Sequence, residues 1–224
     1  MKKLIQYLKI SLCSLPLLAM RSDKPLRVIF FGDSITQAGV GPIGYITKLN
    51  TMLENNGLKD QYELMGAGIG GNKVYDLYLR LEEDVLSKQP DVVLIYIGVN
   101  DVWHKSTSGT GTDPDKFVKF YEALIKKIQA TNAKVILCTP AAIGEKTDFS
   151  NAQDGDMNSY SGLIRDLAKK YSLPLCDLRK AFLEYNLKNN PENKASGILT
   201  TDRVHLNEIG NQFVADMMYK MIVK

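Results

Sequence analysis

The sequence predicts an α/β fold in which five parallel strands alternate with covering helices. Short apolar runs recur along the 224 residues, and segments with apolar side chains at helical spacing separate them. The first run, residues 26–31, is β-branched and aromatic with almost no polar alternation, which is typical of a strand buried on both faces. Because each crossover between parallel strands needs a covering helix, this order favours a doubly wound sheet.

The first half of the chain adds two helices and two strands to that first run. Apolar residues repeat at helical spacing over 45–53 and stop at Asn55-Asn56-Gly57, a helix-ending signal. A short apolar run at 62–65 enters a glycine-rich turn and a second helix over 74–81. Residues 92–97 form the strongest predicted strand, because they are continuously apolar between Pro90-Asp91 and Gly98. A polar loop is predicted at 103–114.

The second half repeats the alternation. A helix over 117–128 places Phe117, Tyr121 and Ile128 on one face, and strands are predicted at 135–139 and 173–178. Between these strands lie a polar loop at 144–156 and a helix over 163–171, and after them a short helix at 182–187 and an irregular stretch at 188–201. The final helix has Ile209, Phe213, Met217 and Met221 as its apolar stripe. No linker interrupts this order, so residues 23–224 are predicted to be one domain.

Residues 1–22 stand apart from this pattern. Lys2, Lys3 and Lys9 precede an uncharged stretch, residues 10–20, that is too short to span a bilayer but suits the core of a signal peptide. We therefore expect residues 1–22 to direct export, to the periplasm or out of the cell. An amphipathic extension that stays in place is the alternative.

Charge and cysteine content exclude several partners. The formal net charge is +3, from 28 basic and 25 acidic residues, but residues 1–22 hold four of the basic residues and no acid. The remaining chain is nearly neutral, so charge gives no argument for nucleic acid or for an anionic membrane surface, and no stable membrane insertion is expected once the leader is removed. Cys138 and Cys176 each lie in a predicted strand, which favours buried packing thiols over a disulfide or metal site.

Polar residues follow the predicted strands at one edge of the sheet. Asp33-Ser34, Gly70-Gly71-Asn72 and Asn100-Asp101 come after the first three strands, and Asp202-Arg203-Val204-His205 lies near the end of the chain. Ligands of open α/β sheets bind beyond the carboxyl ends of the strands, which makes Ser34 a candidate nucleophile. Acyl transfer by a serine also needs a base, a group that orients the base, and donors for the oxyanion.

The base is chosen from only two histidines. His205 follows Asp202 by three residues, a spacing that puts both side chains on one side of a turn and lets the carboxylate orient the imidazole. His104 lies in a predicted loop over the same face, where substrate contact is the expected role. Asp33 and Trp103 are further candidates for substrate contact, Trp103 by stacking on a sugar ring or, alternatively, as a packing residue.

The candidate oxyanion donors are the backbone N–H groups of Ser34 and Gly71 and the side-chain amide of Asn100. Glycine permits close approach and positive φ, and an asparagine after a strand can point its amide into the cleft. The alternative is that these are ordinary turn and cap residues. In that case Asp33, Ser34 or Thr36 caps the next helix, and the Asp202/His205 pair caps a helix near Asn207.

At these residues the chain resembles the SGNH hydrolases, the GDSL-type esterase and lipase superfamily. Gly32-Asp33-Ser34-Ile35 matches the nucleophile block, Gly71 the oxyanion glycine, Gly98-Val99-Asn100-Asp101 the asparagine block and Asp202-Arg203-Val204-His205 the acid and base block. The chain departs from the family at Gly66, where many members have asparagine. The resemblance implies a flavodoxin-like three-layer α/β/α sandwich and ester hydrolysis through an acyl-serine, without a metal or other cofactor.

The predicted function is therefore a serine esterase with Ser34 as nucleophile, His205 as base and Asp202 as its orienting acid. The polar loops at 103–114, 143–156 and 188–201 are expected to wall the cleft, and they favour an acylated carbohydrate or other small polar ester, with deacetylation of a glycan outside the cytoplasm as the leading interpretation. A short-chain lipase or lysophospholipase is the alternative within the family.

Two hypotheses from other classes compete with the esterase. Residues 66–71 fit the G-x-G-x-x-G pattern of dinucleotide-binding proteins, with Asp84 as the acid about twenty residues on. That reading leaves Asp202 and His205 without a role. The second is a carbohydrate- or lipid-binding module without turnover, since a fold by itself does not determine a function.

Overall fold

The five strands form one parallel sheet, as predicted. The computed structural model describes residues 24–223 of the chain. The strands are β1 (Leu26–Gly32), β2 (Tyr62–Gly68), β3 (Val92–Tyr96), β4 (Lys134–Cys138) and β5 (Leu175–Cys176). Their order across the sheet is β2-β1-β3-β4-β5, and every neighbouring pair is parallel. β1 lies inside the sheet and successive side chains from Val28 to Phe31 are buried on both of its faces, which explains why its run is continuously apolar.

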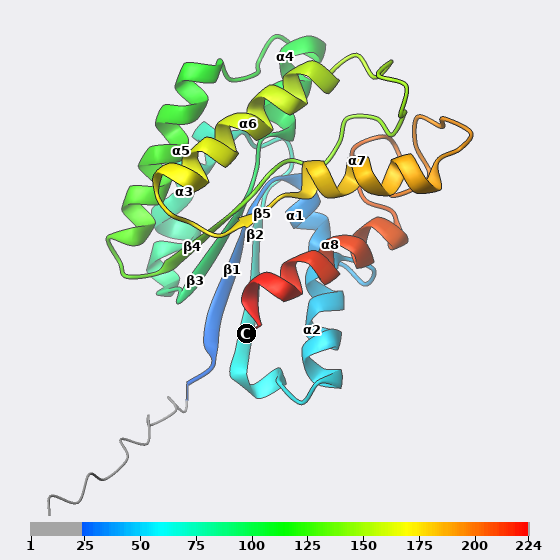
Figure 1. Cartoon of the computed structure of the whole chain (residues 1–224). Helices are drawn as coiled ribbons and strands as arrows, with labels where there is room; N and C mark the ends of the chain where they lie inside the picture. The colour runs from blue at the N-terminus through cyan, green and yellow to red at the C-terminus, as the bar shows by residue number, and fades with distance from the viewer. Residues whose placement is uncertain (1–23, 224) are drawn as a thin grey trace, which may run out of the picture.

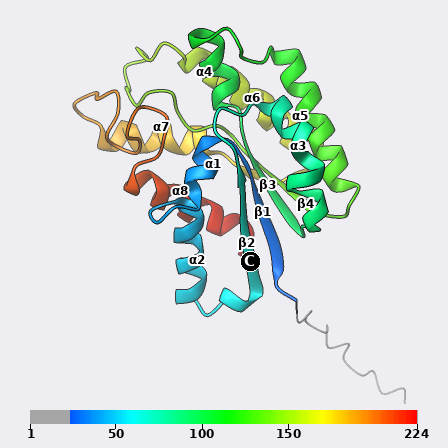
Figure 2. The same cartoon turned by 180° about the vertical axis from the view of Figure 1, so that it is seen from behind.

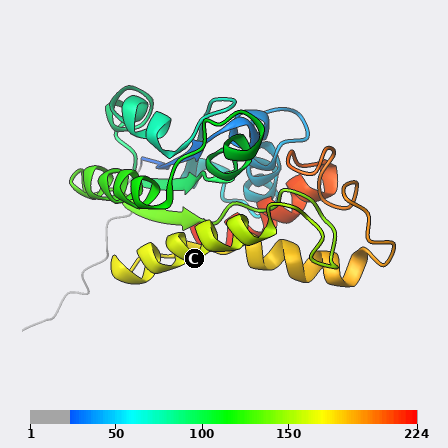
Figure 3. The same ribbon diagram turned by 90° about the horizontal axis from the view of Figure 1, so that it is seen from above.

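Helices cover both faces of this sheet (Figures 1 and 2). One layer contains α2 (Tyr45–Asn55) and α8 (Glu208–Ile222), which pack on each other, and α7 (Leu178–Asn189), whose Phe182 ring contacts Phe213 of α8. The other layer contains α3 (Val74–Asp84), α5 (Pro114–Gln129) and α6 (Asp154–Lys170), with α5 packed against both of the others. The result is the predicted three-layer α/β/α sandwich, seen along the layers in Figure 3.

Short elements complete the chain at the two ends of the sheet. α1 (Ser34–Gly39) and α4 (Val99–Thr107) follow the carboxyl ends of β1 and β3. Two 3-10 turns, η1 (Lys59–Gln61) and η2 (Leu86–Lys88), lead into β2 and β3. No helix between residues 24 and 223 has the length and apolar character needed to cross a bilayer. The predicted leader, residues 1–22, lies outside the described residues.

One predicted loop is wrong, because α4 occupies most of its first half. Residues 103–114 were expected to be irregular, yet the helix runs to Thr107. α4 buries little beyond Val99 and Val102 on its apolar side and leaves residues 105–108 exposed, so its sequence has too short an apolar stripe to show helical spacing. Its start depends on Gly98, which has a φ of +128° that side chains rarely adopt.

Other boundaries also differ from the prediction. β2 continues to Gly68, β5 shortens to two residues, and α6 begins at Asp154 inside the predicted polar loop. In α8 the predicted stripe is wrong at Ile209, which is 56% exposed, and the fully buried face contains Gly210, Asn211, Val214, Ala215 and Met218. Gly210 and Asn211 belong to this face although neither is strongly apolar, and Gly210 packs directly against the Leu199 backbone, which hydropathy does not register.

The two strand cysteines lie as predicted. Cys138 and Cys176 are directly paired across β4 and β5, and both are buried free thiols. They contribute to the core beneath the β5 edge of the sheet and form no disulfide.

Candidate active site

The turn after β1 brings Ser34 to the carboxyl edge of the sheet. Gly32 ends the strand in close contact with Thr36 and the Tyr96 carbonyl, where a side chain would not fit. Asp33 then caps α1, its Oδ1 accepting a hydrogen bond of 3.0 Å from the Ile35 N–H. Ser34 is the first residue of α1, so its own N–H has no carbonyl one turn earlier in the helix to bind.

Ser34, His205 and Asp202 form a hydrogen-bonded row. Ser34 Oγ lies 2.9 Å from His205 Nε2, and His205 Nδ1 lies 2.7 Å from Asp202 Oδ2. Because an ionised carboxylate only accepts, Nδ1 carries the proton, and Nε2 is then free to accept the Ser34 hydroxyl proton. The row joins residues 171 positions apart in sequence.

The turn that carries Asp202 also stabilises the ionised carboxylate. Burial would raise the pKa of Asp202, but hydrogen bonds from the His205 ring and from the N–H groups of His205 and Val204 hold it below its usual value. The alternative helix-cap role does not belong to Asp202 or His205, since Asn207 caps α8 by accepting from the Gly210 N–H.

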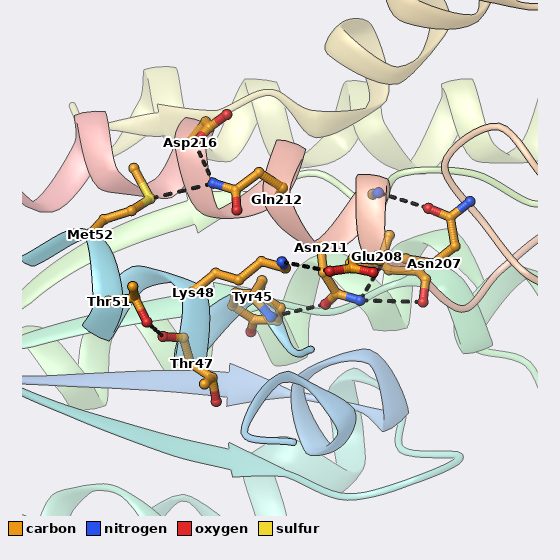
Figure 4. Close-up of polar contacts among 12 residues, drawn as sticks. Tyr45, Thr47, Lys48, Thr51, Met52, Asn207, Glu208, Asn211, Gln212 and Asp216 are labelled. Carbon is orange, nitrogen blue, oxygen red and sulfur yellow. Dashed lines mark hydrogen bonds and ion pairs between the residues drawn. The ribbon is translucent and has the colours of Figure 1, made fainter. Parts of the chain in front are cut away.

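Two residues that sequence reasoning missed hold this turn in place. Glu145, buried in the loop after β4, accepts hydrogen bonds from the N–H groups of Ile198, Leu199 and Thr200. Asn211 of α8 accepts from the Tyr45 N–H of α2 and donates to the carbonyl of Leu206, the residue after His205 (Figure 4). No periodicity or motif distinguishes either residue in the sequence.

The glycine turn lies against Ser34, and among residues 24–223 the candidate donors Gly71 and Asn100 each keep an N–H without an acceptor. A β-carbon built on Gly70 would sit 3.9 Å from Ser34 Cβ, so the glycine turn lies against the serine. Gly71 has a φ of +76°, and its N–H has no hydrogen-bond acceptor between residues 24 and 223. Asn100 donates one amide hydrogen to the Asn72 carbonyl at 3.1 Å, which leaves its second amide hydrogen available.

Two buried carboxyls lie behind the row. Asp33 is only 2% exposed, which contradicts the expectation that it contacts substrate; its role is the cap of α1. Burial raises the pKa of Asp33 to about 7, against the opposing Ile35 hydrogen bond. Burial likewise raises the pKa of Asp101 to about 6, although its carboxylate accepts from the Val74 N–H.

Trp103 and His104 of α4 lie beside the row, where substrate contact was expected. The Trp103 ring meets the His205 ring edge-on, with centroids 6.4 Å apart. His104 Cε1 would be 3.8 Å from a β-carbon on Gly71, which places this ring against the glycine turn. Burial, and then the charge of Lys73, lower the pKa of His104.

The polar loops expected to wall the cleft are tied to one another. Gln153 Nε2 donates to Ser106 Oγ at 3.0 Å, which joins the loop after β4 to the end of α4. Asn193 donates to Asp148 Oδ2 at 2.7 Å and joins the same loop to the segment after α7. Lys105 pairs with Asp113 at 3.2 Å.

The dinucleotide-binding interpretation is wrong. Gly66 and Gly68 belong to β2 and do not form a turn between strand and helix. Gly68 packs against the backbone of α1, which explains the glycine without a phosphate. Asp84 is the last residue of α3 and pairs with Arg80 at 2.6 Å, far from the position that would bind a ribose after the next strand.

Comparison with known proteins identifies the family. Residues 30–213 match the model of the GDSL-like lipase/acylhydrolase family. The crystal structure of AlAXEase, an acetyl xylan esterase, superposes with a TM-score of 0.88 and 67% sequence identity, covering 88% of this chain and 100% of that chain.

Two further relatives are more distant. An acetylxylan esterase of Geobacillus stearothermophilus is 28% identical over 207 residues, which make up 84% of this chain and 90% of that protein. Crystal structures of this organism's acetylxylan esterase Axe2 that are described as catalytic mutants replace a serine, an aspartate and a histidine, the last two three positions apart. The uncharacterized lipoprotein YqeF of Bacillus subtilis strain 168 is 26% identical over 175 residues, 70% of this chain and 72% of YqeF.

Proposed function

The chain belongs to the GDSL-like lipase/acylhydrolase family of carboxylic ester hydrolases, and from this membership we propose that it removes acetyl groups from xylan or xylo-oligosaccharides. Ser34 is the proposed nucleophile, His205 the general base and Asp202 the acid that orients it. Ser34 N–H, Gly71 N–H and Asn100 are the proposed oxyanion donors. The observation that carries this proposal is the row from Ser34 Oγ through the His205 ring to Asp202, beside the unbonded Gly71 N–H.

The mechanism proceeds by two acyl transfers. Ser34 Oγ attacks the acetyl carbonyl while its proton passes to His205 Nε2, and the three donors stabilise the oxyanion. The bond to the sugar oxygen then breaks, the sugar hydroxyl leaves with the proton from His205, and the acetyl group remains bound to Ser34 Oγ as an ester. A water molecule, deprotonated by His205, attacks this ester and releases acetic acid as the proton returns to Ser34.

The choice of acetylated xylan is supported by the relatives. AlAXEase is named an acetyl xylan esterase and aligns over its whole length at 67% identity, and the Geobacillus relative carries the same name. The spacing of Asp202 and His205 equals that of the aspartate and histidine replaced in the Axe2 variants. Trp103 beside His205 would supply an apolar surface for a sugar ring.

Export belongs to the same proposal. The basic and then uncharged character of residues 1–22 suits a signal peptide, and the relative YqeF is named a lipoprotein. An enzyme that acts on polymeric xylan would work outside the cytoplasm, and export is therefore proposed together with that substrate. Removal of residues 1–22 from the protein isolated from its native host, measured by mass spectrometry, is the expected result.

The test of the proposed function is Ser34→Ala. We expect this variant to lose nearly all activity on acetyl esters and on acetylated xylan, because no other residue of the row provides a nucleophile. Ser87→Ala, on the exposed η2 turn, is the matched control and should keep the parental rate. A Ser34→Ala enzyme that still cleaves short aryl esters at the parental rate would remove the proposal.

A panel of acyl chain lengths tests the substrate separately. We expect acetyl esters and acetylated xylan to be cleaved faster than butyryl and longer aryl esters. A preference for longer chains would instead favour the short-chain lipase or lysophospholipase. Stable labelling of Ser34 by a fluorophosphonate separates either enzyme from a binding module without turnover.

A further inference from the structure

In the Gly70–Asn72 turn one backbone N–H group has no hydrogen-bond acceptor within the part of the chain that the structure describes, and backbone groups on either side of it are hydrogen-bonded to side chains. Gly70 N–H, Gly71 C=O and Asn72 C=O each have a side-chain partner, whereas Gly71 N–H has none between residues 24 and 223. The peptide group that joins Gly70 to Gly71 carries this free N–H. Its orientation is set by the torsions on either side, and both glycines lack the side chains that would restrict those torsions.

Gln37 holds the turn on the side before the free donor. Its Oε1 accepts a hydrogen bond of 2.8 Å from the Gly70 N–H. Gln37 lies three residues after Ser34 in α1, so both side chains project from the same side of that helix. The contact therefore ties the glycine turn directly to the helix that carries the proposed nucleophile.

Lys73 holds the turn on the side after the free donor. Its Nζ donates to the Gly71 carbonyl at 3.3 Å and lies 5.7 Å from the centre of the Tyr75 ring. The residue is only 7% exposed, and none of the ion pairs between residues 24 and 223 includes it. A buried cation without a paired carboxylate is costly unless a nearby negative charge develops.

The positive charge of Lys73 affects the pKa values of two neighbouring side chains. After burial, its charge is the next cause of the lowered pKa of His104, and it opposes the rise that burial produces in the pKa of Asp101. His104 lies against the glycine turn, and Asp101 accepts from the N–H of Val74, the first residue of α3, which follows that turn. A positive charge at this place also favours an oxyanion beside Gly71.

We propose that Gln37 and Lys73 are positioning residues that fix the Gly70–Gly71 peptide from both sides, so that, of the two glycine N–H groups in this turn, that of Gly71 points at the reacting carbonyl. Gln37 accepts the hydrogen bond of the Gly70 N–H, which would otherwise be free to bind the oxyanion or a water molecule. Lys73 holds the Gly71 carbonyl and adds positive charge. This inference rests on the proposed serine esterase and assigns two positioning residues to it.

The kinetic test replaces each side chain by methionine, which keeps the length and removes the polar end. For Gln37→Met and Lys73→Met we expect kcat to fall by about 10- to 100-fold, less than or comparable to the loss of an oxyanion donor, with KM changed little. The loss of an interaction that is made only in the transition state lowers kcat and kcat/KM together. Because both residues act on one peptide group, the double variant should lose less than the product of the single effects.

Two surface positions provide matched controls. Lys127→Met also removes a lysine that lies over a tyrosine ring, Tyr78, but on the exposed side of α5. Gln129→Met removes an exposed glutamine near the end of the same helix. Both controls should keep the parental kcat.

A spectroscopic readout separates positioning from general damage. Diethyl 4-nitrophenyl phosphate should phosphorylate Ser34 and place a phosphoryl oxygen among the oxyanion donors. We expect the ³¹P resonance of the folded adduct to shift toward the denatured value in Gln37→Met and Lys73→Met, while their thermal midpoints match those of the controls. Parental kcat and an unchanged resonance in both variants would overturn the inference, whereas an active Ser34→Ala enzyme would instead overturn the proposed function.

Discussion

The pKa values of two aspartates near Ser34 are shifted in opposite directions by their surroundings. Burial raises the pKa of Asp33 to about 7, whereas hydrogen bonds from His205 and Val204 outweigh burial at Asp202 and lower its pKa. Asp202 is therefore ionised whenever His205 needs a carboxylate partner. Asp33 instead carries a proton below neutral pH, and its role is structural.

The raised pKa of Asp33 predicts a pH-dependent stability. Folded Asp33 binds a proton more tightly than unfolded Asp33, so its contribution to the free energy of unfolding is complete below about pH 4 and is lost as pH rises through about 7. Asp33→Asn keeps an oxygen that can cap α1 but cannot ionise. We expect the variant to gain stability relative to the parent between pH 5 and pH 8, measured by urea unfolding.

The control for this measurement is Asp166→Asn, which changes an exposed carboxylate on α6. The difference in free energy of unfolding between Asp166→Asn and the parent should vary much less over the same pH range. Parallel stability curves for the parent and Asp33→Asn would contradict the assignment of this dependence to Asp33.

At the residue scale, motifs predicted the candidate site but not its supports. Ser34, Asn100 and His205 follow from short polar blocks at strand ends, since chemistry demands particular residue types there. Gln37 and Lys73 each act through one hydrogen bond to a backbone group, and Glu145 accepts three. Such contacts depend on where distant backbone segments meet, which no local pattern records.

At the scale of elements, the contact between α2 and α8 determines where His205 lies. Asn211 joins the first residue of α2 to the carbonyl of Leu206, and Lys48 pairs with Glu208 at 3.6 Å across the same contact (Figure 4). Tyr45 continues this connection by donating from its hydroxyl to Thr36 of α1 at 3.0 Å. Polar contacts thus run from the helix of the nucleophile to the turn of the base.

Asn211→Ala should therefore weaken both stability and catalysis. The change leaves the Tyr45 N–H and the Leu206 and Asn207 carbonyls without this partner, and we expect a loss of about 1–3 kcal/mol in the free energy of unfolding. A fall in kcat should accompany it, because the turn that carries His205 is less firmly held. Urea unfolding and esterase kinetics measure the two effects.

The neighbouring Gln212→Ala is the matched control. Gln212 contacts Met52 of α2 and, one turn on in α8, the exposed Asp216, so both quantities should change little (Figure 4). Equal effects of the two substitutions would show that Asn211 has no special role.

The helices and strands that bury the longest apolar runs or stripes were the ones whose bounds the sequence predicted best. β1, β3 and α5 bury long apolar runs or stripes and were predicted with nearly the right bounds. α4 was missed because Val99 and Val102 are its only fully buried apolar side chains. β5 was overextended because Leu173 and Leu178, which flank the two paired positions, also pack in or against the core.

At the scale of the molecule, the β5 edge of the sheet depends on a charged contact. β5 pairs at only two positions, and α7 is joined to α6 through Arg179, which is 1% exposed. Its guanidinium lies 2.7 Å from Asp154 and donates to Asn158 at 2.8 Å. Arg179 thus replaces part of the backbone pairing that a longer strand would provide.

Arg179→Met should leave the Asp154 carboxylate buried without a cation. We expect the free energy of unfolding to fall by about 3–5 kcal/mol, and the double change with Asp154→Asn to recover part of the loss. Lys180→Met is the control, because Lys180 is an exposed neighbour whose pair with Glu184 spans 3.9 Å. A loss at Arg179 no larger than at Lys180 would contradict this account.

The separation of Ser34 and His205 along the chain has a consequence during synthesis. The proposed nucleophile is synthesised 171 residues before the proposed base, and all five strands of the sheet precede that base in the growing polypeptide. The proposed row therefore cannot form until His205 has been added. A product truncated between β5 and His205 would contain the whole sheet and Ser34, and we expect it to lack esterase activity because it lacks the proposed base.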